Sequence, residues 1–209
     1  MLKGFIKGLL AVAMFSMAYI HTPVYLDSQS FDTPRLYVEQ LYQLNGGSGS
    51  AVVIAPGLVL TAAHVAVNDN LLINGKPTKT LKISKDVDLA LVQAQVDCPC
   101  VKLGESPSIG DSVVAVGWPL GKIEYATPGS VQGWADGMLW TDTTIAPGNS
   151  GGGMFAFQNG EWKLVGITVQ VAGMGWGFMG GLPVMHMVRS VTTHQIEDFL
   201  KKALLSDLE

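Results

Sequence analysis

The sequence predicts an all-β fold of short antiparallel strands with one amphipathic helix near its C-terminal end. Apolar runs of three to eight residues with strand-like composition occupy residues 51–55, 58–62, 89–92, 113–117, 138–140, 154–157 and 164–171. A hairpin turn is indicated by Pro56-Gly57, and three more by pairs in which both residues tolerate positive φ, namely Asn74-Gly75, Asp136-Gly137 and Asn159-Gly160. No helical pattern of about 10–15 residues separates the runs, which argues against a parallel β-α-β architecture. Such a chain suits one closed barrel or two small ones.

The composition narrows the classes of protein. The chain of 209 residues has room for one full-sized domain, or for two small lobes that share a core. It is 48% hydrophobic and only 14% charged, which excludes a disordered polymer and a coiled coil. The net charge is −4 and no basic run occurs, so nucleic acid is not an expected partner.

The first twenty residues are typical of an export signal. Lys3 and Lys7 precede an uncharged apolar stretch that ends near residue 20, and Ser16-Met17-Ala18 is a small-x-small cleavage pattern. We predict that residues 1–20 are a signal peptide and that the chain is exported, either periplasmic or secreted. An uncleaved signal anchor, giving a membrane tether, and a buried N-terminal helix are the alternatives.

Residues 21–36 are predicted to be a polar linker that carries Pro23 and Pro34, and residues 37–209 to be the folded domain. At the other end, the period of the pattern changes after Pro183. Apolar residues at spacings of three and four predict an amphipathic helix over residues 184–205, and include Val184, Val188, Val191, Ile196, Phe199, Leu200 and Leu204.

Three short segments contain residues suited to nucleophilic catalysis. His64 ends an apolar strand, Asp88 opens another, and Ser150 lies among glycines in Pro147-Gly148-Asn149-Ser150-Gly151-Gly152-Gly153. Glycines let backbone amides approach a substrate closely. The chain order His, Asp, Ser is that of the chymotrypsin-type triad. Together the three segments predict a serine hydrolase.

Several stretches in register extend this pattern: GSGS (47–50), GLVLTAAHV (57–65), DLALV (88–92), LGES (103–106), VVAVGWPLG (113–121) and TDTTIAPGNSGG (141–152). On these residues the chain resembles the trypsin-like serine proteases, and most closely the protease domain of the HtrA/Deg family, here without a PDZ domain. The resemblance implies two six-stranded antiparallel β-barrels, at about 37–110 and 111–185, with the active site in the cleft between them.

The resemblance also implies a role for each residue in peptide-bond hydrolysis. Ser150 would be the nucleophile, His64 the general base and Asp88 the group that orients His64. Asp86 is the alternative to Asp88, but Asp88 directly precedes the Leu-Ala-Leu strand, as the family pattern requires. The backbone amides of Gly148 and Ser150 would form the oxyanion hole. No cofactor and no metal are expected.

The family register further implies a substrate pocket without charged residues, lined by Thr144, Ile145, Ala146, Pro147, Thr168, Val169, Gln170 and Phe178. We therefore expect cleavage of polypeptide substrates after small or medium apolar P1 residues, in unfolded or exposed segments. A homo-oligomer, such as a trimer, is the assembly implied. Two alternatives are a catalytically latent barrel that binds peptides or acts like a chaperone, and a serine hydrolase that cleaves esters.

Two further groups of residues invite a functional interpretation. Cys98 and Cys100 flank a single proline, and the sequence is compatible with a small disulfide or with two inert thiols. C-x-C alone lacks the other ligands that a zinc site needs. His186 and His194 fall on the predicted terminal helix, where surface or packing histidines are the expected interpretation.

Overall fold

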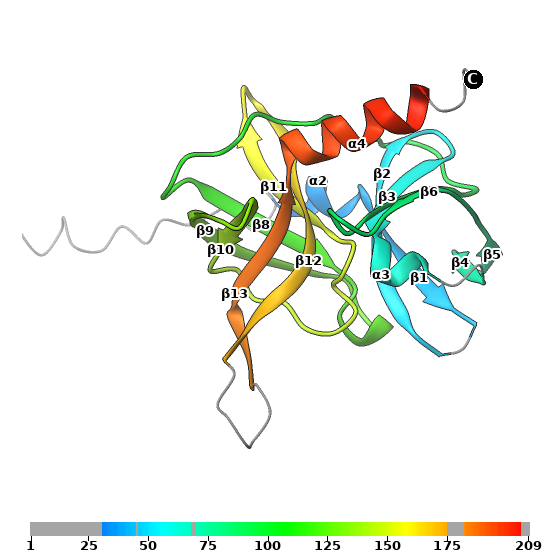
Figure 1. Cartoon of the computed structure of the whole chain (residues 1–209), viewed down its shortest axis with the longest axis horizontal. Coiled ribbons are helices and arrows are strands. Elements are labelled where there is room, and N and C mark those ends of the chain that lie inside the picture. Colours follow the sequence, from blue (N-terminus) through cyan, green and yellow to red (C-terminus); the bar gives the residue numbers. More distant parts are fainter. Residues whose placement is uncertain (1–30, 45, 68–69, 175–181, 206–209) are drawn as a thin grey trace, which may run out of the picture. The chain divides into compact units, whose positions relative to one another are not determined.

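Two antiparallel sheets make up the described part of the chain (Figure 1). The computed structural model describes residues 31–44, 46–67, 70–174 and 182–205, all within a unit that begins at Phe31. The predicted signal segment, residues 1–20, and most of the predicted linker lie outside the described residues. The all-β class and the chymotrypsin-like arrangement are confirmed.

The first sheet has seven strands in the order β5-β4-β1-β2-β3-β7-β6. They are β1 (Val38–Gln43), β2 (Ser48–Ala55), β3 (Leu58–Ala62), β4 (Leu71–Ile73), β5 (Lys76–Pro77), β6 (Lys79–Ser84) and β7 (Leu89–Gln93). Where a closed six-stranded barrel was expected, this sheet is open, since no ladder joins β5 to β6 among the described strands. The two edge strands are short or lysine-bearing, a composition that disfavours further strand pairing.

The second sheet is a closed six-stranded barrel in the order β10-β13-β12-β11-β8-β9. Its strands are β8 (Ser112–Gly117), β9 (Tyr125–Ala135), β10 (Met138–Thr141), β11 (Gly153–Gln158), β12 (Glu161–Met174) and β13 (Leu182–Thr192). A one-turn 3-10 helix, η2 (Pro119–Gly121), follows β8.

The hairpin turns lie where the sequence predicted them. Both residues of each Asx-Gly pair have positive φ: 53° and 73° at Asn74-Gly75, 53° and 72° at Asp136-Gly137, and 54° and 81° at Asn159-Gly160. Two consecutive residues with positive φ match the right-handed twist of the flanking strands, which explains why these pairs connect β4 to β5, β9 to β10 and β11 to β12.

The C-terminal helix is shorter than expected. Helix α4 covers Thr193–Leu205, whereas residues 184–192, predicted as helix, belong to β13. The helix begins at a capping box, because the Thr192 backbone N–H donates to Gln195 Oε1 (2.9 Å) and the Gln195 N–H to Thr192 Oγ1 (3.4 Å). Val188 and Val191 pack into the core from β13, so their apolar spacing belongs to a strand.

The end of the predicted linker is also structured. Residues 31–36, within the predicted linker 21–36, contain a helical turn, α2 (Asp32–Arg35), with Pro34 buried. The Phe31 ring lies edge-on to Trp162, with centroids 6.1 Å apart. The folded domain therefore begins before residue 37.

An ion pair fastens α2 to the loop before β9, with Arg35 Nε 2.9 Å from Glu124 Oε2. The Glu124 side chain is only 16% exposed. Burial raises the pKa of Glu124 above the ordinary value, and the hydrogen bond from Arg35 lowers it in part.

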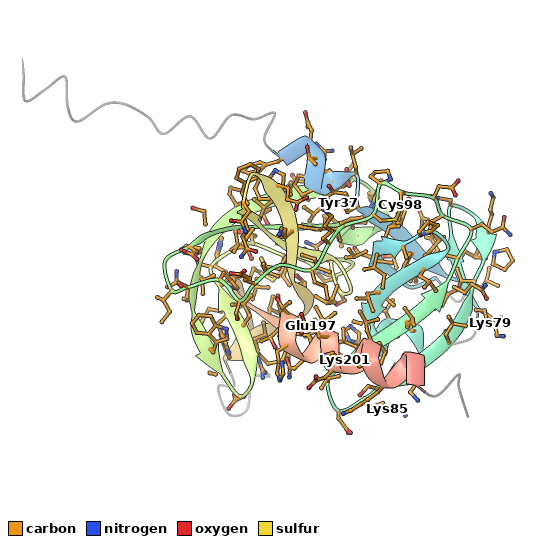
Figure 2. The ribbon with its side chains drawn as sticks, turned by 90° about the horizontal axis from the view of Figure 1, so that it is seen from above. Tyr37, Lys79, Lys85, Cys98, Glu197 and Lys201 are labelled. Carbon is orange, nitrogen blue, oxygen red and sulfur yellow. A yellow bond between two sulfur atoms is a disulfide. The ribbon has the colours of Figure 1, made fainter. Side chains whose placement is uncertain are left out.

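One apolar core joins the two sheets. The larger cluster of buried residues takes Val52, Leu60 and Leu91 from the first sheet and Phe155, Leu164 and Ile167 from the second. Helix α4 covers this junction with its buried stripe of Ile196, Phe199 and Ala203. Its outer side carries Glu197 and Lys201, an exposed pair 3.9 Å apart (Figure 2).

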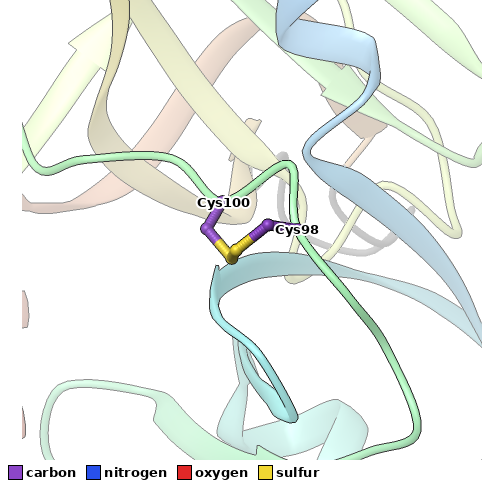
Figure 3. Close-up of a disulfide and its surroundings, with 2 residues drawn as sticks. All are labelled: Cys98 and Cys100. Carbon is purple, nitrogen blue, oxygen red and sulfur yellow. A yellow bond between two sulfur atoms is a disulfide. The ribbon is translucent and has the colours of Figure 1, made fainter.

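Cys98 and Cys100 form a disulfide in the segment that runs from β7 to β8 (Figure 3). This decides between the two alternatives left by the sequence. The segment is fastened next to the bond, since the Val101 N–H donates to the Val53 carbonyl of β2 (3.0 Å).

Candidate active site

His64 stands where the apolar strand β3 ends. The next residues form a single helical turn, α3 (Ala63–Ala66), whose Ala63 and Ala66 are buried while His64 is exposed. The Ala63 backbone N–H donates to the Asp88 carbonyl (3.1 Å), so the start of this turn is fastened to the residue before β7. The local fold therefore presents the imidazole at the surface on a fixed backbone.

Asp88 holds His64 through both of its carboxylate oxygens. Oδ1 accepts the His64 backbone N–H (2.9 Å), and Oδ2 lies 2.8 Å from His64 Nδ1. Asp88 adopts a left-handed φ of 53°, which aspartate tolerates better than most residues. With Nδ1 bound to the carboxylate, Nε2 is the ring nitrogen left for proton transfer.

Ser150 lies on a tight loop between β10 and β11. Gly148 and Gly151 have φ of +100° and +86°, a region that L side chains rarely adopt. At Gly151 a Cβ would overlap Thr61 Oγ1 and the Ser50 carbonyl oxygen and lie 2.9 Å from the Ala62 nitrogen. The loop therefore contacts the end of β3, two residues before His64, and this contact requires glycine.

Further contacts bring the Ser150 loop to the His64 side of the first sheet. The Ser50 backbone N–H donates to the Ser150 carbonyl (2.9 Å). A Cβ on Gly49 would lie 2.6 Å from Val65 Cγ1 and 3.3 Å from the Ser150 carbonyl oxygen. Gly49 thus packs between the residue after His64 and the Ser150 backbone. Among the described residues no hydrogen bond joins the His64 ring to Ser150 Oγ.

The carbonyls around Ser150 are fixed by hydrogen bonds, and this sets the direction of the amides. The Pro147 carbonyl accepts the Leu120 N–H (2.7 Å), and the Asn149 carbonyl accepts the Gly152 N–H (2.9 Å). In a trans peptide the N–H points opposite to the C=O, so the N–H groups of Gly148 and Ser150 point away from these donors. Within the described chain neither amide has an acceptor. Such amides are suited to binding an oxyanion.

The residues of the first predicted pocket wall differ in burial, and one of them points into the barrel core. Thr144 and Pro147 are exposed and Ala146 is half-buried, next to the Ser150 loop in sequence. Ile145, in contrast, packs inside the closed barrel with Met154 and Val188. The barrel core therefore takes up its side chain.

Strand β12 supplies the second predicted wall. The Thr168 carbonyl accepts the Gly151 N–H and its N–H donates to the Gly152 carbonyl, both at 2.8 Å. The Val169 side chain is buried, and Gln170 is exposed and accepts a hydrogen bond from Arg189 (3.0 Å). Phe178 lies outside the described residues.

His186 was placed on the terminal helix by the sequence and lies on β13 instead. Its Nδ1 is 2.8 Å from Thr144 Oγ1, a residue of the predicted pocket. Strand β13 reaches this point because the Ile145 N–H donates to the Met185 carbonyl (3.3 Å). Because residues 184–192 were predicted as helix, the sequence did not indicate that His186 lies next to Thr144.

Ser50 was also missed. It was quoted within the GSGS stretch without a role, yet its buried side chain contacts the Ser150 loop. The sequence offered no local signal for it, since β2 also carries Ser48 and the contacts of Ser50 are with residues far along the chain.

Within the described residues no group of three His, Cys, Asp or Glu side chains is arranged to hold a metal. None of the helices described in the structure is long and apolar enough to cross a bilayer.

Comparison with known proteins decides the family. The model of the family described as Trypsin-like peptidase domain matches residues 49–167, which include His64, Asp88 and Ser150. The chain belongs to the trypsin-like peptidase family. The periplasmic serine endoprotease DegP of Salmonella typhimurium is 31% identical over 172 residues, covering 72% of this chain and 36% of that protein. A probable DegP-like periplasmic serine endoprotease of Pseudomonas fluorescens is 34% identical over 152 residues, covering 64% and 31%.

Two solved structures of proteases share the fold. The HtrA-type protease AlgW with a tripeptide has a TM-score of 0.65 at 24% identity, covering 80% of this chain and 60% of that one. The active form of the Rv3671c protease from M. tuberculosis has a TM-score of 0.68 at 18% identity, covering 87% and 86%. This chain spans about a third of the length of the curated relatives that it matches. The sequence resemblance to the HtrA/Deg family is confirmed.

Proposed function

We propose that this chain is a serine endopeptidase that hydrolyses peptide bonds through an acyl-enzyme formed on Ser150. The observation that carries the proposal is the pairing of Asp88 with both the backbone and the imidazole of His64. The glycine-rich Ser150 loop contacts the end of β3, the strand that leads to His64. Family membership supports the same activity.

Each group has a step that its position allows. Asp88 holds Nδ1, so His64 Nε2 takes the proton from Ser150 Oγ as the hydroxyl attacks the carbonyl carbon. The Gly148 and Ser150 amides, which have no acceptor within the described chain, bind the developing oxyanion. His64 then returns the proton to the leaving amine, and a water molecule hydrolyses the acyl-enzyme in the reverse sequence of transfers.

A peptide substrate fits the exposed edge of β12. Strand β11 pairs with β12 only as far as Ile167, and β12 continues to Met174 with β13 as its neighbour among the described strands. An extended peptide adds to such an edge through main-chain hydrogen bonds. We propose an apolar P1 residue, because the described residues of the predicted pocket carry no charge.

We also propose that the chain is exported, because the relatives that it matches are named periplasmic serine endoproteases.

The test is a mass-spectrometric digest of casein by the full chain, beside Ser150→Ala and with Asp86→Asn as a matched active control. We expect cuts after apolar residues that disappear in the Ser150→Ala variant and persist in the control. Cuts mainly after Lys or Arg would overturn the P1 proposal. Hydrolysis of a simple ester without any peptide cleavage would indicate an esterase, and tight peptide binding without cleavage a latent binding module.

A further inference from the structure

Ser50 lies on β2, where its side chain is completely buried. Its hydroxyl donates to the Gly148 carbonyl (2.8 Å) and accepts the Trp118 backbone N–H (2.9 Å). Its own carbonyl accepts the Thr61 hydroxyl (2.7 Å), and its N–H donates to the Ser150 carbonyl (2.9 Å). One residue of the first sheet therefore uses all its polar groups to connect β3, the start of η2 and the Ser150 loop.

The hydroxyl acts on the peptide in the middle of the predicted oxyanion hole. The Gly148 carbonyl belongs to the peptide group between Gly148 and Asn149, whose N–H donates to the Ala146 carbonyl (3.0 Å). The peptide groups on either side are fixed by Leu120 and Gly152. Rotation of the middle peptide would turn both neighbours, and with them the N–H groups of Gly148 and Ser150.

The same hydroxyl also supports the neighbouring clamp. Trp118, whose N–H it accepts, is the residue before η2, and Leu120 in that turn holds the Pro147 carbonyl. Leu120 has an unfavourable φ of 56°, so this turn depends on surrounding contacts to keep its conformation. Ser50 therefore reaches the Gly148 amide by two routes, one through Gly148 itself and one through Trp118 and Leu120.

We propose that Ser50 is a positioning residue that sets the direction of the Gly148 and Ser150 amides; the proposal rests on the proposed peptidase function. A serine is suited to this place because one hydroxyl donates and accepts at the same time. Alanine would leave the Trp118 N–H and the Gly148 carbonyl without this partner. Space is also limited, since a Cβ on Gly117 would lie 3.0 Å from Ser50 Oγ.

The test compares Ser50→Ala with Thr193→Val in the full chain. Thr193 is the matched control, because its hydroxyl is also buried and donates to a carbonyl, that of Val165 (3.2 Å), at the start of α4. With a peptide substrate, Ser50→Ala should lower kcat about 10- to 100-fold and leave KM within about twofold. A peptide boronic acid, which resembles the tetrahedral intermediate, should bind more weakly by the same factor. Thr193→Val should change none of these.

Amide hydrogen exchange provides a readout independent of activity. In Ser50→Ala the N–H groups of Trp118, Leu120 and Asn149 should exchange at least about tenfold faster than in the wild type and in Thr193→Val. The proposal is overturned if these rates are unchanged, or if kcat falls equally in both variants. Should the wild type hydrolyse nothing, the proposed function fails, and the exchange rates alone decide whether Ser50 holds the loop.

Discussion

The Asp88 carboxylate binds His64 at two points, the backbone N–H through Oδ1 and the ring Nδ1 through Oδ2. The first contact fixes the backbone from which the imidazole projects, and the second fixes the rotation and tautomer of the ring. A carboxylate is required, since an amide side chain has only one oxygen to accept with. This relationship predicts an unequal effect of two neighbouring substitutions.

Asp88→Asn should lower kcat about 10⁴-fold, because the amide nitrogen facing Nδ1 stabilises the wrong tautomer of His64. Asparagine tolerates the φ of 53°, so the folded state should persist and circular dichroism should be unchanged. Asp86→Asn, two residues earlier, should keep the wild-type kcat. An Asp88→Asn variant that retained more than a tenth of the activity would contradict the assignment.

Gly151→Ala should destabilise the protein far more than Gly110→Ala. Both glycines have nearly the same φ, +86° and +88°, so each substitution pays a conformational cost of about 1–2 kcal/mol. Only at Gly151 would the new Cβ overlap Thr61 and Ser50, which adds about 1–3 kcal/mol. Urea unfolding of the two variants measures the difference. Equal free energies of unfolding would show that the loop does not press against β3.

His186→Ala should change the P1 preference, because His186 is the hydrogen-bonding partner of the Thr144 hydroxyl in the predicted pocket. The ratio of kcat/KM between peptides with Leu and with Thr at P1 should shift about tenfold. His194→Ala is the control, since His194 is 82% exposed on α4 and pairs with Asp198 there. A profile of cleavage sites identical in all three proteins would place Thr144 outside the pocket.

Replacing both Cys98 and Cys100 with alanine should lower the free energy of unfolding by about 1–2 kcal/mol at most. The bond joins residues only two positions apart, so it removes little entropy from the unfolded chain. Among the described residues no hydrogen bond joins either cysteine to the candidate active site, and the rate of peptide hydrolysis should stay the same. Urea unfolding with and without reductant checks this, and a loss above about 3 kcal/mol would refute the entropic account.

Glu124→Gln and Glu161→Gln should change the pH dependence of stability in opposite directions. Burial raises the pKa of Glu124, so its ionisation opposes folding, and the wild type should lose stability relative to Glu124→Gln as the pH rises through and above 4.5. The hydrogen bond from Lys102 lowers the pKa of Glu161, so the wild type should lose stability relative to Glu161→Gln as the pH falls below 4.5. Unfolding in urea between about pH 3 and 7 measures both. Two difference curves of the same sign would contradict the assignment.

The sequence predicted most reliably what depends on local chemistry. The Asx-Gly turns were located because positive φ at two successive residues selects those residue types. Strand β9 was missed, since Pro128 and Gly129 interrupt it and it pairs in the sheet despite them. The terminal helix was drawn too long because the apolar spacing of Val188 and Val191 suits both a helix and a buried strand. The capping box of Thr192 and Gln195 would have marked its start.

For the site, the sequence indicated His64, Asp88 and the Ser150 loop, because each stands in a distinctive local pattern. It could not indicate Ser50 or His186, since their importance comes from contacts across the fold. Ser50 meets Gly148 from 98 positions away, and His186 meets Thr144 from 42 positions away. Ile145 was predicted to line the pocket from the family register, but its side chain packs in the barrel core.

The bond between Ser50 and Gly148 has a consequence for the nascent chain. When only the strands of the first sheet have been synthesised, the chain contains His64 and Asp88 but does not yet contain the Ser150 loop. The Ser150 loop is held in shape by the first sheet, so the proposed hydrolytic activity depends on contacts between distant segments and should arise late in folding. An incomplete chain would then be unable to cleave other chains that are still unfolded.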